Sequence, residues 1–407
     1  MATYTRNERD EATVSLRCEG PREAVIALAA SARALAGSCT RARFLPFAID
    51  RFADADLVAS GVESRRVPPG SWPDGVLAEL ERLPALPIVW GGAFESHLEL
   101  LAAISRRRPL LGTPLHGVAR AKDPFVVAEV LRAAGVATPA VRADEPGARD
   151  GWLSKPLRGS GGGGIRAAVE VAPSSDRFLQ ARASGLAASA VFVAHREESR
   201  VTSPAETRRG ARALLVGVTR QLVGVGWLAA PAFSYCGTVA PLALARSTRE
   251  QVQRAGDALA RELGLVGVFG IDFLLDGDRA VIIEVNPRYT AAVEIVERVL
   301  GVAIVDLHVR ASRDEPVAMT LPDAHHAAAK AVVFASPDAR FVPPSDAASR
   351  ELARRYAWLA DTPLNDQAIA AGEPAFTICC DAPDCESAWR RVRELAGILR
   401  AECLRSR

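Results

Sequence analysis

A run of glycines near the middle of the chain restricts the local fold most strongly, because it lies between two segments with the composition of strands. Residues 159–164 read Gly-Ser-Gly-Gly-Gly-Gly, and Lys155 stands directly after a predicted strand at Gly151–Ser154. Successive glycines let backbone N–H groups close over an anion, and a strand-borne ammonium group can neutralise a phosphate. The run therefore predicts a phosphate-binding hairpin, with a flexible linker as the alternative.

Two common phosphate motifs do not fit this run. A Walker loop ends in glycine, lysine and serine or threonine, and it opens a helix. Here the lysine precedes the glycines and a predicted β-segment at Ile165–Val169 follows them, which also argues against the glycine pattern of a Rossmann fold. The loop is therefore expected to join two strands.

A second feature is a predicted hairpin that carries oxygen ligands. Its strands, Phe269–Leu275 and Ala280–Val285, are joined by an Asp-Gly-Asp turn. Side chains alternate along a strand, so Glu284 and Asn286 point to one face, and Asp272 can face them across roughly 5 Å. Mg²⁺ binds through one or two carboxylates plus substrate phosphates, so the hairpin predicts a magnesium site. The alternative is a solvated acidic hairpin.

The N-terminal part has the pattern of a parallel sheet. An apolar segment at Glu23–Leu28 leads into small residues at Ala29–Ala36 that are expected to be helical, and Arg43–Ile49 and Leu86–Trp90 read as further strands. This βαβ beginning predicts an open parallel-sheet domain over residues 21–118. Residues 1–20 are polar and are expected to be frayed.

The rest of the chain mixes strands and helices without regular alternation, which is typical of an α+β arrangement. We expect a middle domain at residues 119–315 and a small C-terminal domain at residues 316–407. Asp123 and Pro124 mark the start of a helix over residues 123–134. Further predicted elements are a strand at Ala187–Ala194, a hairpin at residues 213–228, helices at Thr248–Leu263 and from Ala291 to Leu300, strands near Lys330–Ala335 and Ala375–Cys380, and a closing helix from Ser387 to about Cys403.

Composition excludes several classes of protein. Hydrophobic residues make up 49% and charged residues 24%, as in folded globular proteins, and a formal net charge of +2 gives no field that would attract nucleic acid. No apolar stretch approaches the roughly 18 to 20 residues of a membrane span. Seven cysteines without paired metal-ligand spacing indicate free thiols of a reducing compartment. We therefore expect a cytoplasmic protein without nucleic-acid or membrane partners.

Lysine is rare in this sequence. Only Lys122, Lys155 and Lys330 are lysines among 50 basic residues. Arginine presents a planar fork, whereas lysine presents a compact charge on a thin stem, which a narrow phosphate pocket can demand. Each lysine is therefore a candidate functional residue.

Together these motifs resemble the ATP-grasp superfamily of carboxylate-amine ligases and biotin-carboxylase-like enzymes, over about residues 20–400. Within it the chain is most similar to the predicted carboligase branch, which includes tyramine-glutamate-type ligases of methanofuran synthesis. That finer assignment depends on Ser-Ala-Arg at 31–33, Asn-Pro-Arg-Tyr-Thr at 286–290 and Ala-Gly-Glu-Pro at 371–374. The resemblance implies a Rossmann-like N-terminal domain, a central ATP-binding lobe and a C-terminal lobe that closes the cleft.

The resemblance also implies which residues bind the nucleotide. Lys155 would contact the ATP phosphates, and Gln180 would accept from the adenine amino group, where the family usually has a glutamate. Lys122 lies two residues before the usual position of a second phosphate lysine, which is Pro124 here, so its role stays open. The ribose-binding glutamate is replaced by Ala187. The loop that would cover the phosphates consists of Gly159, Ser160, Gly161, Gly162, Gly163 and Gly164.

The implied reacting centre contains metal ligands and an arginine. Asp272, Glu284 and Asn286 would hold Mg²⁺, or Mn²⁺ in its place. Arg288 would face the reacting carboxylate or the transferred phosphoryl group, so Arg288 and Lys155 are the predicted catalytic residues. For Arg288 the alternative is a structural ion pair with an acid such as Glu294. Tyr235 and Cys236 either line a substrate pocket or belong to a packed loop.

These implications predict an ATP-dependent ligase that forms an amide through an acyl phosphate and releases ADP and phosphate. Glutamate ligation in methanofuran-type coenzyme synthesis is one candidate role. Alternatives are a biotin-carboxylase-like carboxylase and a nucleotide-binding regulatory protein without turnover. The expected partners are small carboxylates and amines, amino acids among them, and the chain is a candidate homodimer.

Overall fold

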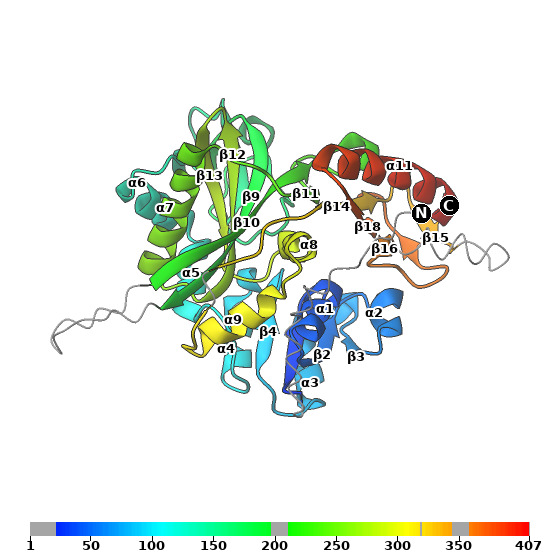
Figure 1. The fold of residues 1–407 in the computed structure, drawn as a ribbon. Helices are drawn as coiled ribbons and strands as arrows, with labels where there is room; N and C mark the ends of the chain where they lie inside the picture. Colours follow the sequence, from blue (N-terminus) through cyan, green and yellow to red (C-terminus); the bar gives the residue numbers. More distant parts are fainter. Residues whose placement is uncertain (1–21, 197–210, 318–319, 344–357, 407) are drawn as a thin grey trace, which may run out of the picture.

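The computed structural model describes residues 22–196, 211–317, 320–343 and 358–406. Figure 1 shows an N-terminal sheet with its helices at the bottom of the view, a central lobe, and a C-terminal unit at the upper right. The predicted class is confirmed, with α/β organisation in the N-terminal sheet and α+β organisation beyond it. Residues 1–20, predicted to be frayed, lie outside the described residues.

The N-terminal part is a parallel sheet, as expected, and it has a fourth strand, β3 (Glu63–Arg66), that the sequence did not predict. Its strands are β1 (Ala24–Leu28), β2 (Leu45–Asp50), β3 (Glu63–Arg66) and β4 (Ile88–Trp90), in the order β3-β2-β1-β4. Its helices are α1 (Arg33–Arg41), α2 (Ala55–Ala59), α3 (Val76–Glu81) and α4 (Leu98–Ser105), with 3-10 turns η1 (Pro69–Ser71) and η2 (Phe94–Ser96).

The first helix begins later than the sequence predicts. Ala29 and Ala30 are not helical, and α1 begins only at Arg33. The backbone N–H of Ala30 donates to Gly92 O at 3.2 Å, and that of Ala32 donates to Asp50 Oδ2 at 2.6 Å. These bonds hold the segment across the carboxyl ends of the strands, so small residues there form a loop.

A small antiparallel sheet follows and carries the glycine loop. It is preceded by α5 (Leu115–Lys122) and α6 (Pro124–Ala133), whose N-cap Asp123 accepts from the N–H groups of Phe125 and Val126. The strands, in the order β5-β8-β6-β7, are β5 (Val141–Ala143), β6 (Trp152–Pro156), β7 (Arg166–Ala167) and β8 (Arg177–Ala181), with the 3-10 turn η3 at Ala168–Glu170. The glycines join β6 to β7, so the predicted hairpin is present.

The largest sheet has eight strands and runs from the central lobe into the C-terminal unit. Its order is β13-β12-β9-β10-β11-β14-β18-β16, and the pairs are antiparallel. The strands are β9 (Leu186–Arg196), β10 (Ala211–Val223), β11 (Tyr235–Ala240), β12 (Gly267–Asp276), β13 (Arg279–Asn286), β14 (Ala327–Phe334), β16 (Leu359–Ala360) and β18 (Pro374–Ala382). A separate small sheet contains β15 (Ala339–Phe341), β17 (Ala368–Ile369) and β19 (Leu404–Ser406).

The hairpin predicted at residues 213–228 is wrong. Most of that segment lies in the single strand β10, which pairs with β9 on one side and β11 on the other. The chain turns only afterwards, through the 3-10 turn η4 (Gly226–Leu228), where Gly224 has a φ of +59° and its N–H donates to Ser234 O at 2.9 Å. Inside the strand, Gly217 leaves room for Val296, which a Cβ would approach to 2.7 Å.

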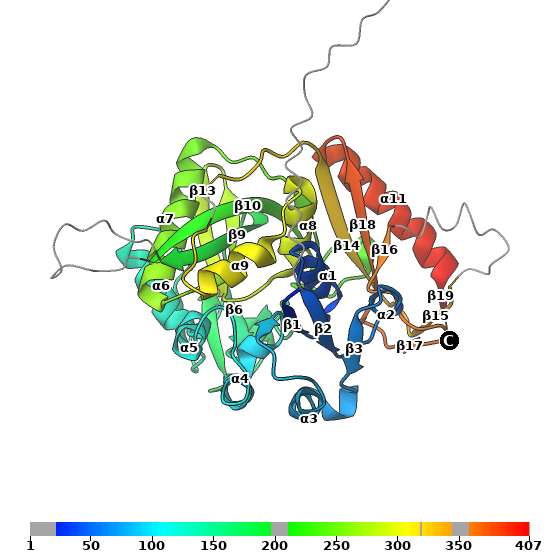
Figure 2. The same ribbon diagram turned by 60° about the horizontal axis from the view of Figure 1, so that its bottom comes forward.

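Helices cover both faces of the large sheet. They are α7 (Arg246–Leu263), α8 (Ala291–Leu300), α9 (Ile304–Ser312) and α11 (Cys385–Cys403). One face packs on α7 around the stacked rings of Phe192 and Phe269. On the other face, α8 and α9 lie between the large sheet and α1, as Figure 2 shows. The N-terminal sheet and the large sheet therefore share one apolar core through these two helices.

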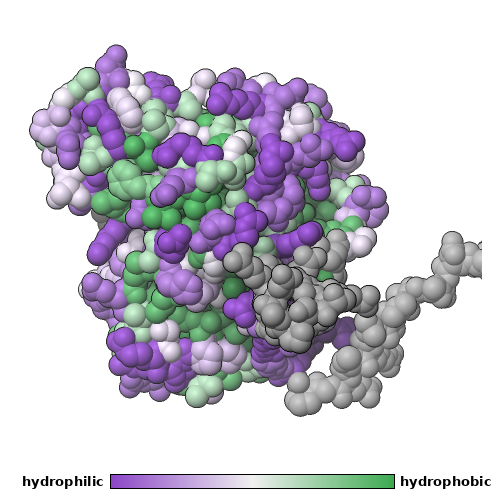
Figure 3. Space-filling model, turned by 90° about the vertical axis from the view of Figure 1, so that its left-hand side faces the viewer, coloured by the Kyte–Doolittle hydropathy of each residue, from purple (hydrophilic) through white to green (hydrophobic). Residues whose placement is uncertain are grey.

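Figure 3 shows one face of the molecule, on which hydrophobic residues gather in two areas divided by a band of hydrophilic ones. Among the described residues, no helix is long and apolar enough to cross a membrane. The homodimer stays a prediction.

Candidate active site

The glycine loop is shaped by contacts that require glycine. Gly161, Gly162 and Gly164 have φ values of +63°, +80° and +76°. A Cβ on Gly162 would lie 1.9 Å from Phe233 O, and Gly161 O accepts from the N–H of Tyr235 at 3.1 Å. The loop therefore packs directly on the segment that leads into β11.

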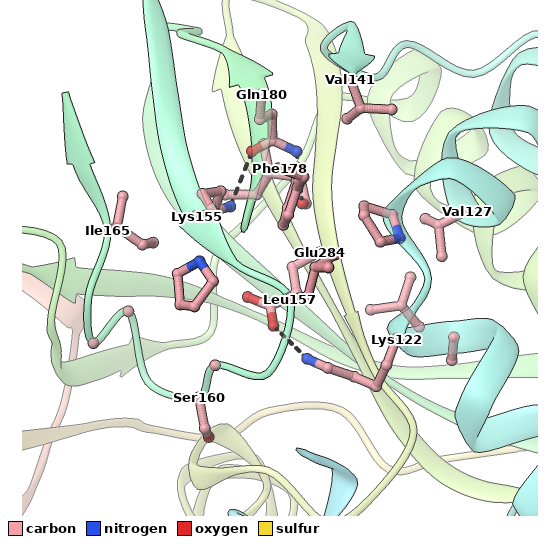
Figure 4. Close-up of a pocket in the computed structure, with 18 of the residues that line it drawn as sticks. Lys122, Val127, Val141, Lys155, Leu157, Ser160, Ile165, Phe178, Gln180 and Glu284 are labelled. Carbon is pink, nitrogen blue, oxygen red and sulfur yellow. Dashed lines mark hydrogen bonds and ion pairs between the residues drawn. The ribbon is translucent and has the colours of Figure 1, made fainter. Parts of the chain in front are cut away.

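Lys155 and Gln180 face each other from neighbouring strands, as Figure 4 shows. Lys155 is only 9% exposed, and its Nζ donates to Gln180 Oε1 at 2.9 Å. Gln180 Nε2 in turn donates to Ile283 O at 3.2 Å. Burial lowers the pKa of Lys155, and the carboxylates of Glu284 and Asp272 oppose this shift. The ammonium group is thus held at the pocket wall.

These two residues line a small cavity of about 70 Å³ between the small sheet and α5–α6. Its floor is β13, through Ile283, Glu284 and Val285, and its other walls are largely apolar. The apolar lining includes Val127, Val141, Leu157, Ile165 and Phe178. An apolar slot with an amide at one end and a lysine beside a glycine loop suits a flat base linked to phosphates.

The predicted metal ligands lie together. Asp272 and Glu284 are directly opposite in the β12–β13 ladder, and Asn286 Nδ2 donates to Asp272 Oδ2 at 3.2 Å. Burial first, and then the neighbouring Glu284, raise the pKa of Asp272 to about 6. Gln221 Nε2 donates to the other oxygen of Asp272 at 2.8 Å. A bound cation would stabilise these two opposed carboxylates, of which Asp272 has the raised pKa.

Lys122 is the cation that reaches this pair. Its Nζ lies 3.0 Å from Glu284 Oε1. Burial alone would raise the pKa of Glu284, but Lys122 and Lys155 outweigh burial, and the pKa is lowered. A lysine two residues earlier than the family position therefore still reaches the site from the end of α5.

Arg288 is buried beside the predicted metal ligands. Its Nη2 donates to Asn286 Oδ1 at 3.2 Å and lies 2.6 Å from Glu95 Oε1, to which its Nε also donates at 2.7 Å. Its acidic partner is thus Glu95 and not Glu294, which pairs with Arg33 and Lys330. Burial alone would raise the pKa of Glu95, but Arg288 lowers it.

Glu95 was not among the site residues predicted from the sequence. It lies in η2, just after β4, and is 1% exposed. Ser160 Oγ donates to its Oε1 at 3.4 Å, and Ser96 Oγ donates to Gly159 O at 3.3 Å, so this turn also contacts the glycine loop. The available signal was its position after a parallel strand, because ligand sites gather at the carboxyl ends of such strands.

A larger cavity, of about 600 Å³, adjoins the first and is bounded by all three parts of the chain. Lys155, Asp272 and Arg288 line its inner wall. Tyr235 lines it too, whereas the adjacent Cys236 belongs to the core. The three lysines of the chain therefore all line these two cavities, since Lys122 faces the smaller one and Lys330 the larger.

The structure thus brings together the predicted nucleotide, metal and catalytic residues around adjoining cavities. Their roles stay predictions. Among the described residues, no group of three or more His, Cys, Asp or Glu side chains could hold a metal ion. The candidate metal site has two carboxylates and one amide, as Mg²⁺ accepts when phosphates complete its shell.

Residues 121–292 match a family model described as an ATP-grasp domain. The carbamoyl phosphate synthase large chain of Myxococcus xanthus is 27% identical over 248 residues, 57% of this chain and 22% of that one. The chain thus spans about a fifth of the length of this curated relative.

Solved structures extend the likeness to nearly the whole chain. A biotin carboxylase–β,γ-ATP complex from Campylobacter jejuni has a TM-score of 0.65 at 13% identity, covering 94% of this chain and 92% of that one. An L-amino acid ligase from Bacillus licheniformis has a TM-score of 0.63 at 15% identity, covering 95% and 100%. The predicted resemblance is confirmed: the chain contains an ATP-grasp domain at residues 121–292 and has the ATP-grasp fold.

Proposed function

We propose that the chain is an ATP-dependent carboxylate–amine ligase. The observation that carries this proposal is that Lys122 and Lys155, the Asp272–Glu284 pair and Arg288 meet at the junction of a base-sized slot and a larger cavity. The slot suits adenine, the junction suits the phosphates, and the larger cavity has room for two small substrates.

The nucleotide would be held mainly by the small sheet. The adenine amino group would donate to Gln180 Oε1, which now accepts from Lys155 Nζ at 2.9 Å. Lys155 would then turn to a phosphate, because a charged partner is stronger than a neutral amide. The backbone N–H groups of residues 159–164 would close over the phosphates.

The residues present fit a magnesium ion. The pKa of Asp272 is raised to about 6 by burial and by Glu284, so a bound cation would stabilise the ionised form of this carboxylate. Mg²⁺ would be held by Asp272, Glu284 and Asn286, and when bound it neutralises charge on the terminal phosphates. Mn²⁺ accepts the same oxygen donors.

Arg288 would grip the acceptor carboxylate. That carboxylate attacks the γ-phosphorus, the bond to the ADP oxygen breaks, and an acyl phosphate forms. A neutral amine then attacks the acyl carbon, loses its proton, and inorganic phosphate leaves. Glu95 would fix the guanidinium so that it meets migrating charge without reorganising.

The products of the nucleotide test this proposal. A screen of carboxylate and amine pairs, amino acids included, should release ADP and inorganic phosphate, measured by chromatography. Release of AMP and pyrophosphate would instead identify an enzyme that adenylates its substrate. ADP release that needs bicarbonate and no amine would favour the carboxylase alternative.

Lys155→Ala should weaken Mg-ATP binding by about 10-fold or more, because a desolvated phosphate loses its charged partner. Lys155→Arg should also bind poorly, because the slot beside Gln180 admits a thin stem. Calorimetry measures both, with Arg132→Ala on the exposed face of α6 as the control for loss of a cation. Unchanged affinity in Lys155→Ala would contradict the nucleotide assignment.

Several finer statements remain proposals. They are amino-acid substrates, glutamate ligation in methanofuran-type coenzyme synthesis, a cytoplasmic location, and a homodimer.

A further inference from the structure

The end of the larger cavity away from the glycine loop is rich in carboxylates. Five acids from three parts of the chain interact there with one another and, apart from Asp50, with the buried cations Arg33 or Lys330. The acids, named here the acid cluster, are Asp50, Asp54, Asp56, Glu294 and Asp361. Arg51 also lines the cavity, with its guanidinium 5.2 Å from the ring centre of Phe52. Even when Arg51 is counted with Arg33 and Lys330, the acidic side chains outnumber the basic ones.

Most of these charges are already compensated. Arg33 donates two hydrogen bonds to Glu294, at 2.7 and 3.0 Å, and one to Asp361 at 2.8 Å. Lys330 donates to Glu294 at 2.8 Å. Of the other three acids, Asp50 accepts from the backbone N–H groups of Ala32, Phe52 and Ala53. Asp56 accepts from those of Asp361 and Thr362, and it also lies 3.4 Å from Arg33 Nε.

Asp54 is the exception. It lines the cavity and is only 6% exposed, yet its Oδ2 has no hydrogen-bond partner among the described residues. It occupies the N-cap position of α2 without making the side-chain bond of a cap. Leaving a buried carboxyl oxygen without a hydrogen-bond partner is costly in either protonation state, so the arrangement is explained if a ligand supplies the missing partner.

We propose that Asp54 binds a cationic group of a substrate, an ammonium or guanidinium that is not the reacting group. This inference takes from the proposed function only the placement of the reacting groups at Arg288. The substrate class is a basic amino acid or a diamine, one end of which reaches the acid cluster while the other end reacts.

The topology sets the length of such a substrate. An ideal Cβ on Gly92 would lie 3.7 Å from the Arg288 guanidinium, so the chain just after β4 marks the reacting end. Asp54 follows β2, and β1 separates β2 from β4. Two strand spacings put the two ends on the order of 10 Å apart. A cation on an extended aliphatic chain spans that distance, whereas a small α-amino acid does not.

The electrostatics of Asp54 add a measurable signature. Burial first, and then Asp361, Asp50 and Asp56, raise its pKa to about 9, while Arg33 opposes the shift. The free protein therefore holds this carboxyl protonated at pH 7. A bound cation favours the ionised form, so its binding must expel about one proton.

Calorimetry on the full chain with 1,5-diaminopentane and its neutral isostere 1,5-pentanediol tests the proposal. We expect the diamine to bind about 10-fold or more tightly than the diol, because the diol cannot neutralise the carboxylate. In buffers of different ionisation enthalpy at pH 7, diamine binding should release close to one proton. Its affinity should rise about tenfold per pH unit between pH 6 and 8.

Asp54→Asn should abolish both the preference for the diamine and the proton release. Glu63→Gln, at an exposed acid of β3, should change neither. Equal affinity for the two probes, or a preference retained in Asp54→Asn, would overturn the proposal, and so would diamine binding without proton release. A thermal melt verifies that the variant folds. Failure of Mg-ATP to bind the wild-type chain would refute the proposed function alone, because the probe titrations contain no nucleotide.

Discussion

The guanidinium of Arg288 is held from two sides, by the carboxylate of Glu95 and by the amide oxygen of Asn286. An arginine so close to the proposed metal site has a clear use if an anion enters between them. Its planar fork can grip two oxygens while charge moves from one to the other, which a lysine cannot do.

We therefore expect Arg288→Lys to keep the fold and most of the Mg-ATP affinity but to lower kcat by on the order of 100-fold, as when a transition-state donor is displaced. Steady-state kinetics, a thermal melt and a Mg-ATP titration on the one variant check this. Glu95→Gln should lower kcat less, because the arginine remains. Wild-type turnover, or unfolding without a kinetic defect, would remove Arg288 from the reacting centre.

Asp54 gives a prediction about stability. Its pKa is raised to about 9 in the folded protein, so the native state holds a proton that the unfolded state has already lost above about pH 4. Stability therefore falls as pH rises from about 4 towards 9. Asp54→Asn removes this loss, and its Tm should exceed the wild-type Tm by a margin that grows between pH 5 and 8. A constant difference across that range would contradict the assigned pKa.

Residues whose partners are near in sequence were predictable. The Asp272–Glu284 pair could be predicted because side chains alternate along two strands that are joined by one short turn. The rarity of lysine in the sequence indicated three residues that line the cavities. Glu95 and Asp54 could not be found in this way. Glu95 meets a partner 193 positions away, and the Arg33–Glu294 bond spans 261 positions. Such contacts depend on how the sheets pack, which a local pattern does not contain.

At the scale of elements, the glycine loop permits a matched test. A Cβ at Gly162 would collide with Phe233 O at 1.9 Å, in a backbone conformation with a φ of +80°. A Cβ at Gly163 would meet nothing nearer than Ser160 O at 3.5 Å. Two neighbouring glycines of one loop therefore differ sharply in what they tolerate.

Gly162→Ala should displace the loop from β11 and raise the KM for ATP by about 10-fold, since strain and collision together cost on the order of 1–3 kcal/mol. Gly163→Ala should remain within about 2-fold of wild type, because its contact is ordinary. Kinetics at varied ATP concentration measure both. Equal KM values for the two variants would mean that the loop does not hold the nucleotide in this conformation.

The wrong hairpin at residues 213–228 has a physical cause. The alternating apolar residues of β10 fit a strand of any length, and where a strand ends depends on its partners. Here β9 and β11 flank β10 along most of its length, so pairing continues to Val223. The hairpin of β12 and β13 was correct because a two-residue turn dictates its pairing locally.

At the scale of the molecule, Lys330 ties the C-terminal strands to α8 through Glu294. Lys330→Met leaves Glu294 with Arg33 as its remaining cation. We expect a loss of about 1–3 kcal/mol in the free energy of unfolding, because a buried hydrogen bond between two charged groups is removed. Arg310→Met, which breaks an exposed ion pair with Asp306, should cost less than about 1 kcal/mol. Urea unfolding measures the free energy of unfolding of both variants. Equal losses would show that the buried Lys330–Glu294 bond contributes no more to stability than an exposed ion pair.

The eight-stranded sheet limits how the molecule can open. Backbone hydrogen bonds run without a break from β13, which carries Glu284 and Asn286, to β18 in the C-terminal unit, so separating these regions would require strand pairs to break. The small sheet is not part of this ladder. Its links to the large sheet include the isolated bridge between Ala137 and Val281, the Gln180–Ile283 hydrogen bond and the contact of the glycine loop with Tyr235. If the proposed nucleotide site is correct, a movement that opens it would break these few links and carry Lys155 away from Asp272 and Glu284, while the eight-stranded ladder stays paired.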